Sequence, residues 1–255
     1  MPEERPRILI YDVGDTLLET KGYDPAAGIR HLLALAALFN RDDADGRTAA
    51  SPAALPSVEA VLERTLELNR HLGVRCEATM LEYSQQTFHR LLYDAFGVTF
   101  SLSPQELELE YWKHALVFEP EPGVEQALRT ARDLGYRQAV ISNTAFSGET
   151  IDYELRRYGL AEYFEFIVAT ADYGVRKPDP RIFQAALGRA GVEAPEAWYI
   201  GNTVEYDVRG AAAAGIRPVW YNRAGNSGRP PGGTLQVSGW KEFADLLRQE
   251  VPAPS

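Results

Sequence analysis

The second half of the chain alternates short apolar runs with helical stretches, and this alternation restricts the fold more than any other feature. Its apolar runs are rich in β-branched and aromatic residues, and the stretches between them carry apolar residues at helical spacing. We predict strands at 137–142, 164–170, 197–201 and 217–221, and helices at 124–134, 150–158, 180–190 and 204–214. Such alternation predicts an α/β fold, a doubly wound parallel sheet with helices on both faces.

A further strand is predicted at residues 7–12, where an apolar run ends in Asp12. Two other predicted strands also end in polar residues, one in Ser142 and Asn143 and the other just before Asn202. In open parallel sheets, functional groups gather at the carboxyl ends of the strands. We therefore expect these side chains, distant in sequence, to converge on one crevice.

Residues 25 to about 118 follow a different pattern, with apolar residues at helical spacing in three stretches. A fourth helix is predicted to begin at Ser103, because Glu106 completes a capping box with it. No strand is predicted inside this segment. We therefore predict a helical-bundle cap at 20–118, inserted into a core formed by residues 1–19 and 119–255.

Composition excludes several classes of function. The net charge of −10 and the pI near 5.0 disfavour binding to nucleic acid or anionic membranes, which would be repelled. No apolar run approaches the roughly 20 residues that span a bilayer. The single cysteine, Cys76, cannot form an intramolecular disulfide, and the first residues lack the apolar core of a secretion signal. We expect a cytoplasmic protein, monomeric or homodimeric.

Four short motifs follow one another along the chain. Asp12 is followed four residues later by a threonine, and Ser142 closes a predicted strand. Lys177 precedes a proline, and residues 201–207 read Gly-Asn-Thr-Val-Glu-Tyr-Asp. Each motif is common alone, but the ordered set resembles the haloacid dehalogenase-like hydrolase superfamily. The resemblance implies a Rossmann-like core with a cap inserted between the first two motifs.

The resemblance also implies a chemistry for these positions. Asp12 would be the nucleophile that attacks phosphorus and forms an acyl phosphate, which divides the displacement into two easier steps. Ser142 and Lys177 would act with it as catalytic groups on the phosphoryl oxygens. Ser142, Asn143 and Lys177 would bind the substrate, expected to be a small phosphorylated metabolite.

A hard cation is expected beside these groups, because the nucleophile and the phosphate are both anionic. Mg²⁺ prefers carboxylates, backbone oxygens, water and phosphate. The resemblance implies ligation by the Asp12 carboxylate, the Gly14 carbonyl and the Asn202 side chain. Asp207 is placed with the metal ligands, or it orients Lys177 or metal-bound water.

Two positions depart from the phosphatase pattern. Gly14 stands where these phosphatases carry the acid that protonates the leaving group, and general acid-base catalysis is commonly worth about 10²- to 10⁴-fold. The neighbouring Asp15 need not face the leaving oxygen. Asn202 replaces an expected aspartate, so one formal charge on the metal site is lost.

Other reactions of the superfamily stay open at this point. A 2-haloacid dehalogenase would need a cap arginine, for which Arg30, Arg41 and Arg47 are available. A phosphonate hydrolase would need a cap lysine, which only Lys21 or Lys113 could supply. A weakly active or non-catalytic metabolite-binding protein is a further alternative. We favour a Mg²⁺-dependent hydrolase of small phosphomonoesters.

Overall fold

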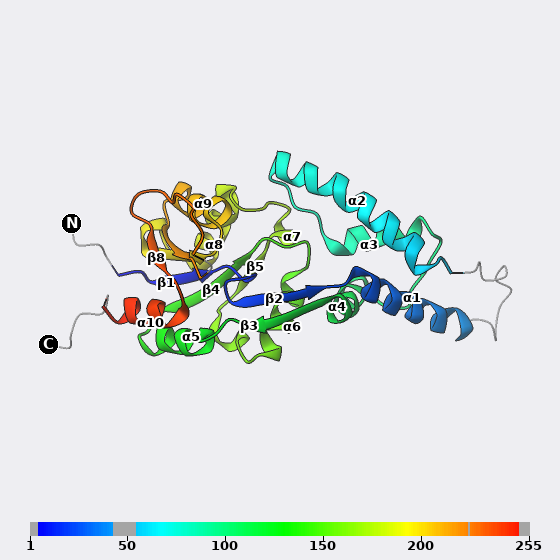
Figure 1. Ribbon diagram of the computed structural model, residues 1–255, viewed down its shortest axis with the longest axis horizontal. Coiled ribbons are helices and arrows are strands. Elements are labelled where there is room, and N and C mark those ends of the chain that lie inside the picture. The colour runs from blue at the N-terminus through cyan, green and yellow to red at the C-terminus, as the bar shows by residue number, and fades with distance from the viewer. Residues whose placement is uncertain (1–4, 43–54, 224, 250–255) are drawn as a thin grey trace.

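Six parallel strands form the sheet of the core, in the order β5-β4-β1-β6-β7-β8 (Figure 1). The computed structural model describes residues 5–42, 55–223 and 225–249. The strands are β1 (Ile8–Tyr11), β4 (Arg137–Ser142), β5 (Ile167–Ala169), β6 (Ala197–Gly201), β7 (Arg217–Tyr221) and β8 (Leu235–Val237). The predicted doubly wound α/β sheet is confirmed.

Helices cover both faces of this sheet. They are α5 (Val124–Asp133), α6 (Gly148–Arg157), α7 (Thr170–Tyr173), α8 (Pro180–Ala190), α9 (Arg209–Ala213) and α10 (Trp240–Gln249). Side chains alternate along β1, so Leu9 and Tyr11 pack in one apolar cluster with α5, α6 and α10. Ile8 and Ile10 point to the opposite face and pack with α8 and α9. Because both faces are buried, the strand is apolar throughout rather than alternating.

Two elements of the core differ from the prediction: one strand is shorter, and one helix begins with a π-helical turn. The strand predicted at 164–170 is limited to β5, because α7 begins at Thr170 and a short 3-10 turn ends at Tyr163. The helix predicted at 204–214 starts as a π-helical turn, η4 (Val204–Val208), before α9. Such turns often occur at functional sites.

Four helices form the other end of the molecule (Figure 1). They are α1 (Pro25–Asp42), α2 (Val58–Thr79), α3 (Gln85–Asp94) and α4 (Pro104–Ala115). α4 begins as predicted, because the Ser103 hydroxyl caps the Glu106 N–H and the Glu106 carboxylate accepts from the Ser103 N–H. The apolar faces of these helices form their own core around Leu32, Phe88 and Tyr111.

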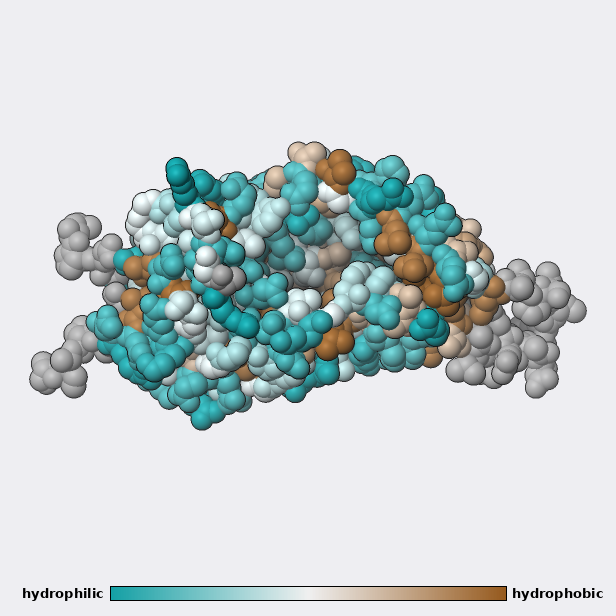
Figure 2. Space-filling model, in the orientation of Figure 1, coloured by the Kyte–Doolittle hydropathy of each residue, from teal (hydrophilic) through white to brown (hydrophobic). Residues whose placement is uncertain are grey.

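Hydrophobic surface gathers over the helical end of the molecule, whereas the core end of this face is mostly hydrophilic (Figure 2). α2 exposes Leu66 and Val74. Within the described ranges, no helix combines the length and the apolar run that a membrane span requires.

An antiparallel pair of strands that the sequence did not indicate joins the two ends of the molecule. β2 (Leu18–Tyr23) pairs with β3 (Leu116–Pro120), and the predicted boundaries after residues 19 and 118 fall inside these strands. The prediction of no strand was wrong at residues 116–118, because most of the pair is exposed and no apolar alternation marks it. β2 and β3 are far apart in the sequence, so their pairing depends on long-range contact and leaves no pattern within either segment.

His89 of α3 makes the stability of the helical end depend on pH. Its side chain is buried beside the Gln85 amide, and burial lowers the pKa of His89 to about 3. An unfolded histidine binds a proton near pH 6.5, so acid favours the unfolded chain. Above about pH 6.5 both states hold His89 neutral, so the residue costs no stability there. As the pH falls from 6.5 toward 3, only the unfolded chain binds the proton, and the free energy of unfolding decreases. Between pH 7 and pH 5 we expect a loss of about 2 kcal/mol from this residue.

Urea unfolding at both pH values measures this effect. His89→Gln should unfold with a smaller difference between pH 7 and pH 5 than the unsubstituted protein. His71→Gln, which changes an exposed histidine of α2, is the matched control and should leave the difference unaltered. The same pH dependence in all three proteins would contradict the assignment.

Candidate active site

Three strand ends meet at one edge of the sheet. β1 lies between β4 and β6, so Asp12, which follows β1, has Ser142 at the end of β4 on one side. Asn202, which follows β6, lies on the other side. The order of the strands reverses at β1, which is where ligands bind in open α/β sheets.

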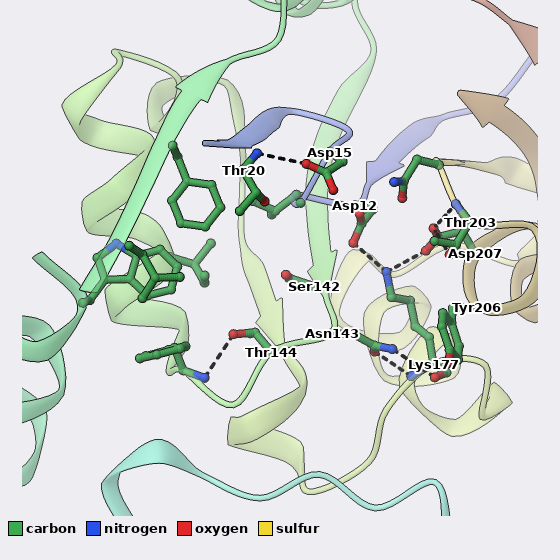
Figure 3. Close-up of a pocket in the computed structure, with 18 residues that line it drawn as sticks. Asp12, Asp15, Thr20, Ser142, Asn143, Thr144, Lys177, Thr203, Tyr206 and Asp207 are labelled. Carbon is green, nitrogen blue, oxygen red and sulfur yellow. Dashed lines mark hydrogen bonds and ion pairs between the residues drawn. The ribbon is translucent and has the colours of Figure 1, made fainter. Parts of the chain in front are cut away.

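A cavity of about 300 Å³ opens at this edge (Figure 3). Every residue that the sequence placed in the site lines it: Asp12, Gly14, Ser142, Asn143, Lys177, Asn202 and Asp207. Its volume is at the lower end of the range for small-molecule sites. A small substrate therefore fits the space.

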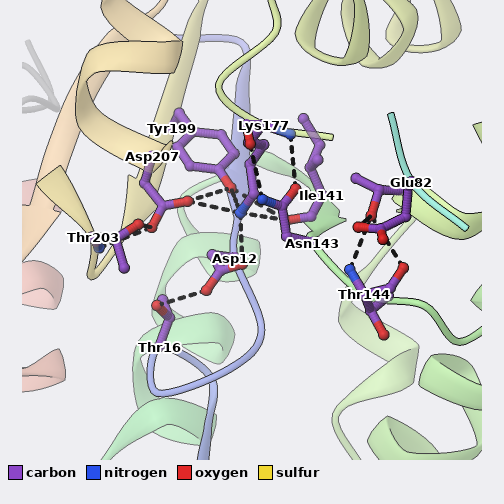
Figure 4. Close-up of polar contacts among 11 residues, drawn as sticks. Asp12, Thr16, Glu82, Ile141, Asn143, Thr144, Lys177, Tyr199, Thr203 and Asp207 are labelled. Carbon is purple, nitrogen blue, oxygen red and sulfur yellow. Dashed lines mark hydrogen bonds and ion pairs between the residues drawn. The ribbon is translucent and has the colours of Figure 1, made fainter. Parts of the chain in front are cut away.

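Lys177 occupies the centre of a buried network (Figure 4). Its Nζ donates at 2.7 Å to Asp12 Oδ1, to Asp207 Oδ1 and to the Tyr199 hydroxyl. Burial alone would lower the pKa of Lys177, but Asp12 and Asp207 outweigh burial and raise it. The group is therefore a fixed ammonium between two carboxylates.

Asp12 is almost enclosed, with 7% of its surface exposed. Besides the bond from Lys177, its Oδ2 accepts from the Thr16 hydroxyl at 3.2 Å, four residues later on the same loop. Burial raises the pKa of Asp12 to about 6, against the effect of Lys177, and Asp207 adds to the rise. Both carboxylate oxygens are thus oriented by fixed donors.

Asp207 is held against Lys177 by its own turn. Its Oδ2 accepts from the Thr203 N–H at 2.9 Å and from the Thr203 hydroxyl at 2.6 Å, while Oδ1 faces Lys177. A Cβ at Gly201 would lie 2.4 Å from Asp207 Cγ, so only glycine allows this approach. With both oxygens engaged, Asp207 is better placed to position Lys177 than to ligate a metal.

The side chain of Asn143 holds the backbone of Lys177 at the cavity. Its Oδ1 accepts from the Lys177 N–H at 2.8 Å, and its Nδ2 donates to the Lys177 carbonyl at 3.0 Å. Asn143 also lines the cavity, so its predicted role in substrate binding stays a prediction. The Ser142 hydroxyl points into the cavity (Figure 3) and has no hydrogen-bond partner among the described residues.

The missing acid leaves open space at Gly14. A Cβ built there would meet no atom within 4 Å. Asp15 does not fill the gap, because its backbone is left-handed, with φ 53°, and its Oδ1 accepts from the Thr20 N–H at 2.9 Å. That bond ties the Asp15 carboxylate to the backbone of β2.

The donor set of the cavity suits a hard cation. Asp12, Gly14 and Asn202 offer carboxylate, backbone and amide oxygens to the same space. The Asn202 carbonyl accepts from the Trp220 indole N–H at 3.0 Å, which fixes the backbone of that residue. No histidine or cysteine is among the described lining residues, so the oxygens fit Mg²⁺ better than a softer metal.

An apolar wall, which the sequence analysis missed, completes the cavity. It consists of Trp112, Leu116, Phe118, Phe146 and Ile151, together with Val13. Trp112 of α4 stacks on Phe118 of β3, with 5.2 Å between the ring centroids. It meets Phe146 edge-on, with 4.7 Å between the centroids. No local signal could have revealed this wall, because it is assembled from a helix, an unpredicted strand and the core.

Comparisons with known proteins agree with this architecture. Residues 60–221 match the family model of the haloacid dehalogenase-like hydrolases. Phosphoserine phosphatase of Thermus thermophilus is 31% identical over 141 residues, which is 55% of this chain and only 55% of that enzyme. Haloacid dehalogenase-like hydrolase domain-containing protein 3 of Bos taurus is 31% identical over 215 residues, 82% of this chain and 79% of that protein. The crystal structure of 2-haloacid dehalogenase from Pseudomonas syringae shares the fold, with a TM-score of 0.62 and 23% identity over 96% of this chain and 100% of that one. The chain belongs to the haloacid dehalogenase-like hydrolase family.

Proposed function

We propose that this protein is a Mg²⁺-dependent hydrolase of small phosphomonoesters, with Asp12 as the nucleophile. The observation that carries the proposal is the buried ammonium of Lys177, 2.7 Å from Asp12, in a cavity that the Ser142 hydroxyl also faces. A fixed cation and a hydroxyl donor beside an oriented carboxylate suit a phosphoryl group, whose oxygens carry the charge.

The reaction proceeds in two displacements. An Asp12 carboxylate oxygen forms a bond to phosphorus while the bond to the ester oxygen breaks, and the leaving group takes the electron pair. A water molecule then attacks the phosphorus of the aspartyl phosphate, the bond to Asp12 breaks, and inorganic phosphate is released. Lys177 and Ser142 stabilise the phosphoryl oxygens in both steps, while Asp207 and Asn143 keep Lys177 in place.

Asp12, the Gly14 carbonyl and Asn202 are the groups that would hold the metal. When bound, Mg²⁺ offsets the repulsion between the nucleophile and the phosphate. The ionised forms of Asp12, Lys177 and Asp207 sum to a charge of −1, which favours cation binding only modestly. Since Asn202 is neutral where the family usually carries aspartate, we expect weaker metal affinity than in a site with both carboxylates.

The comparisons support a phosphatase without naming the substrate. One relative is named as a phosphoserine phosphatase, and the matched region spans about half of its length. The small cavity supports a small phosphorylated metabolite as the partner. A cytoplasmic location and a monomeric or homodimeric state stay predictions from the sequence.

The alternative reactions find less support. A 2-haloacid dehalogenase would need a cap arginine for the haloacid carboxylate, and no arginine is among the described lining residues. Arg30 does not line the cavity, whereas the Arg41 side chain and Arg47 lie outside what the structure describes. Lys21 and Lys113 pair with glutamates away from the cavity, which disfavours a phosphonate hydrolase.

Phosphate release from p-nitrophenyl phosphate tests the proposal, because this leaving group needs little protonation and tolerates Gly14. We expect turnover with Mg²⁺, loss of turnover with EDTA, and recovery with excess Mg²⁺. Halide release from 2-chloropropionate should be absent. Halide release insensitive to EDTA would instead identify a dehalogenase, and phosphate binding in calorimetry without turnover would identify a binding protein.

A further inference from the structure

The cavity has two chemically different halves. One half carries the polar groups at the strand ends, with the Lys177 ammonium among them. The other is the apolar wall, in which Trp112, Phe118 and Phe146 present packed aromatic rings and Leu116 and Ile151 add aliphatic surface. A phosphomonoester whose phosphate lies at the polar half must place its organic part against this wall. Aromatic rings gain most from such a surface, because they bury large apolar areas and pack on other rings.

Among the described lining residues, no cation is left to pair with a second anionic group on the substrate. Lys177 is already shared by two carboxylates, and the other charged groups of the described lining are acids, including Asp15. A carboxylate on the leaving group would therefore be desolvated beside apolar side chains without compensation. The wall thus favours an uncharged organic group.

Gly14 sets a second requirement, which is independent of the wall. With no acid at this position, and with Asp15 committed to the Thr20 N–H, the leaving oxygen departs without a proton from the protein. Only a weakly basic leaving group departs readily in this way. Phenols meet the requirement, whereas aliphatic alcohols do not.

From these two features we infer that the cavity selects aryl phosphates whose aryl group carries no charge, with phenols as leaving groups. The inference rests on the proposed phosphatase function and names its substrate class. In the first displacement, the bond between phosphorus and the aryl oxygen breaks and the phenolate leaves with the electron pair. The phenolate then takes a proton from water, and hydrolysis of the aspartyl phosphate completes the turnover.

Three substrates of nearly equal size separate the two requirements. 4-Methylphenyl phosphate and benzyl phosphate are isomers, and only the first has a phenolic leaving group. We expect kcat/KM for 4-methylphenyl phosphate to exceed that for benzyl phosphate by about 100-fold or more. 4-Carboxyphenyl phosphate has the less basic leaving group, yet its extra anion should lower kcat/KM by about tenfold relative to the methyl compound.

A substitution in the wall tests its role directly. Leu116 is half-buried at the start of β3, and Leu116→Arg would place a cation at the wall. The ratio of kcat/KM for 4-carboxyphenyl over 4-methylphenyl phosphate should rise by about tenfold or more. Leu91→Arg, at an exposed position of α3 outside the cavity lining, is the matched control and should leave the ratio unchanged.

The outcomes distinguish this inference from the function on which it rests. Comparable kcat/KM values for all three substrates would overturn the substrate class and leave the phosphatase intact. Equal shifts in Leu116→Arg and Leu91→Arg would overturn the role of the wall. Failure to release phosphate from any of the three, and from p-nitrophenyl phosphate, would overturn the proposed function and the inference with it.

Discussion

Asp12→Asn is expected to lower kcat for p-nitrophenyl phosphate by on the order of 10⁴-fold or more, since loss of a covalent nucleophile removes the reaction path itself. The amide keeps the shape of the side chain and one oxygen for the Thr16 hydroxyl, so the change is mainly chemical. Steady-state phosphate release with saturating Mg²⁺ measures the loss. Thermal unfolding of the same sample shows whether the variant is folded.

Asp15→Asn is the matched control, three residues away and with the same chemical change. Its oxygen can still accept from the Thr20 N–H, so the turn is preserved. We expect kcat within about threefold of the unsubstituted protein, as for a group outside the reaction. Similar losses in the two variants, or an Asp12→Asn protein that retains full turnover, would exclude Asp12 as the nucleophile.

Gly14→Asp is expected to raise kcat/KM for alkyl phosphates by about 10²- to 10⁴-fold, because it restores an acid where the leaving oxygen departs. The position has room for the side chain, since no atom lies within 4 Å of a Cβ there. Aryl phosphates should gain much less, because phenolates leave without protonation. Parallel assays of benzyl and 4-methylphenyl phosphate measure the difference.

Gly14→Asn separates the acid from the shape of the side chain. It fills the same space without a transferable proton, so it should produce no gain on benzyl phosphate. A gain in Gly14→Asn equal to that in Gly14→Asp, or equal gains on both substrates, would show that the missing acid does not limit the reaction.

The strand ends that carry the motifs could be predicted from the sequence, because each depends on the local pattern of apolar and polar residues. A buried parallel strand is a continuous apolar run, and its carboxyl end is marked by the first polar residue, as at Asp12, Ser142 and Asn202. The meeting of these ends at one edge of a parallel sheet predicted one shared site, and the resemblance to the haloacid dehalogenase-like hydrolases added Lys177 to it. The structure places all of them along one cavity.

The partners of these groups could not be predicted, because they depend on distances across the fold. The Tyr199 hydroxyl accepts a hydrogen bond from Lys177 Nζ, although in the sequence Tyr199 is only another aromatic residue in the buried run of β6. The position of Asn143 after Ser142 gave no sign that its amide also bonds to the Lys177 backbone, 34 residues later in the chain.

By itself, the sequence determined the doubly wound core, the inserted helices, and the acid, hydroxyl, ammonium and amide brought to one edge of the sheet. The fold and the strand ends follow from apolar periodicity, which is a property of short segments, whereas Lys177 was added by the resemblance to the haloacid dehalogenase-like hydrolases. Only the tertiary structure decided that Asp207 and Asn143 position Lys177, that open space surrounds Gly14, and that an aromatic wall faces the polar groups. Those features arise where side chains from separate segments pack within a few ångströms, and packing of that kind leaves no period in the sequence.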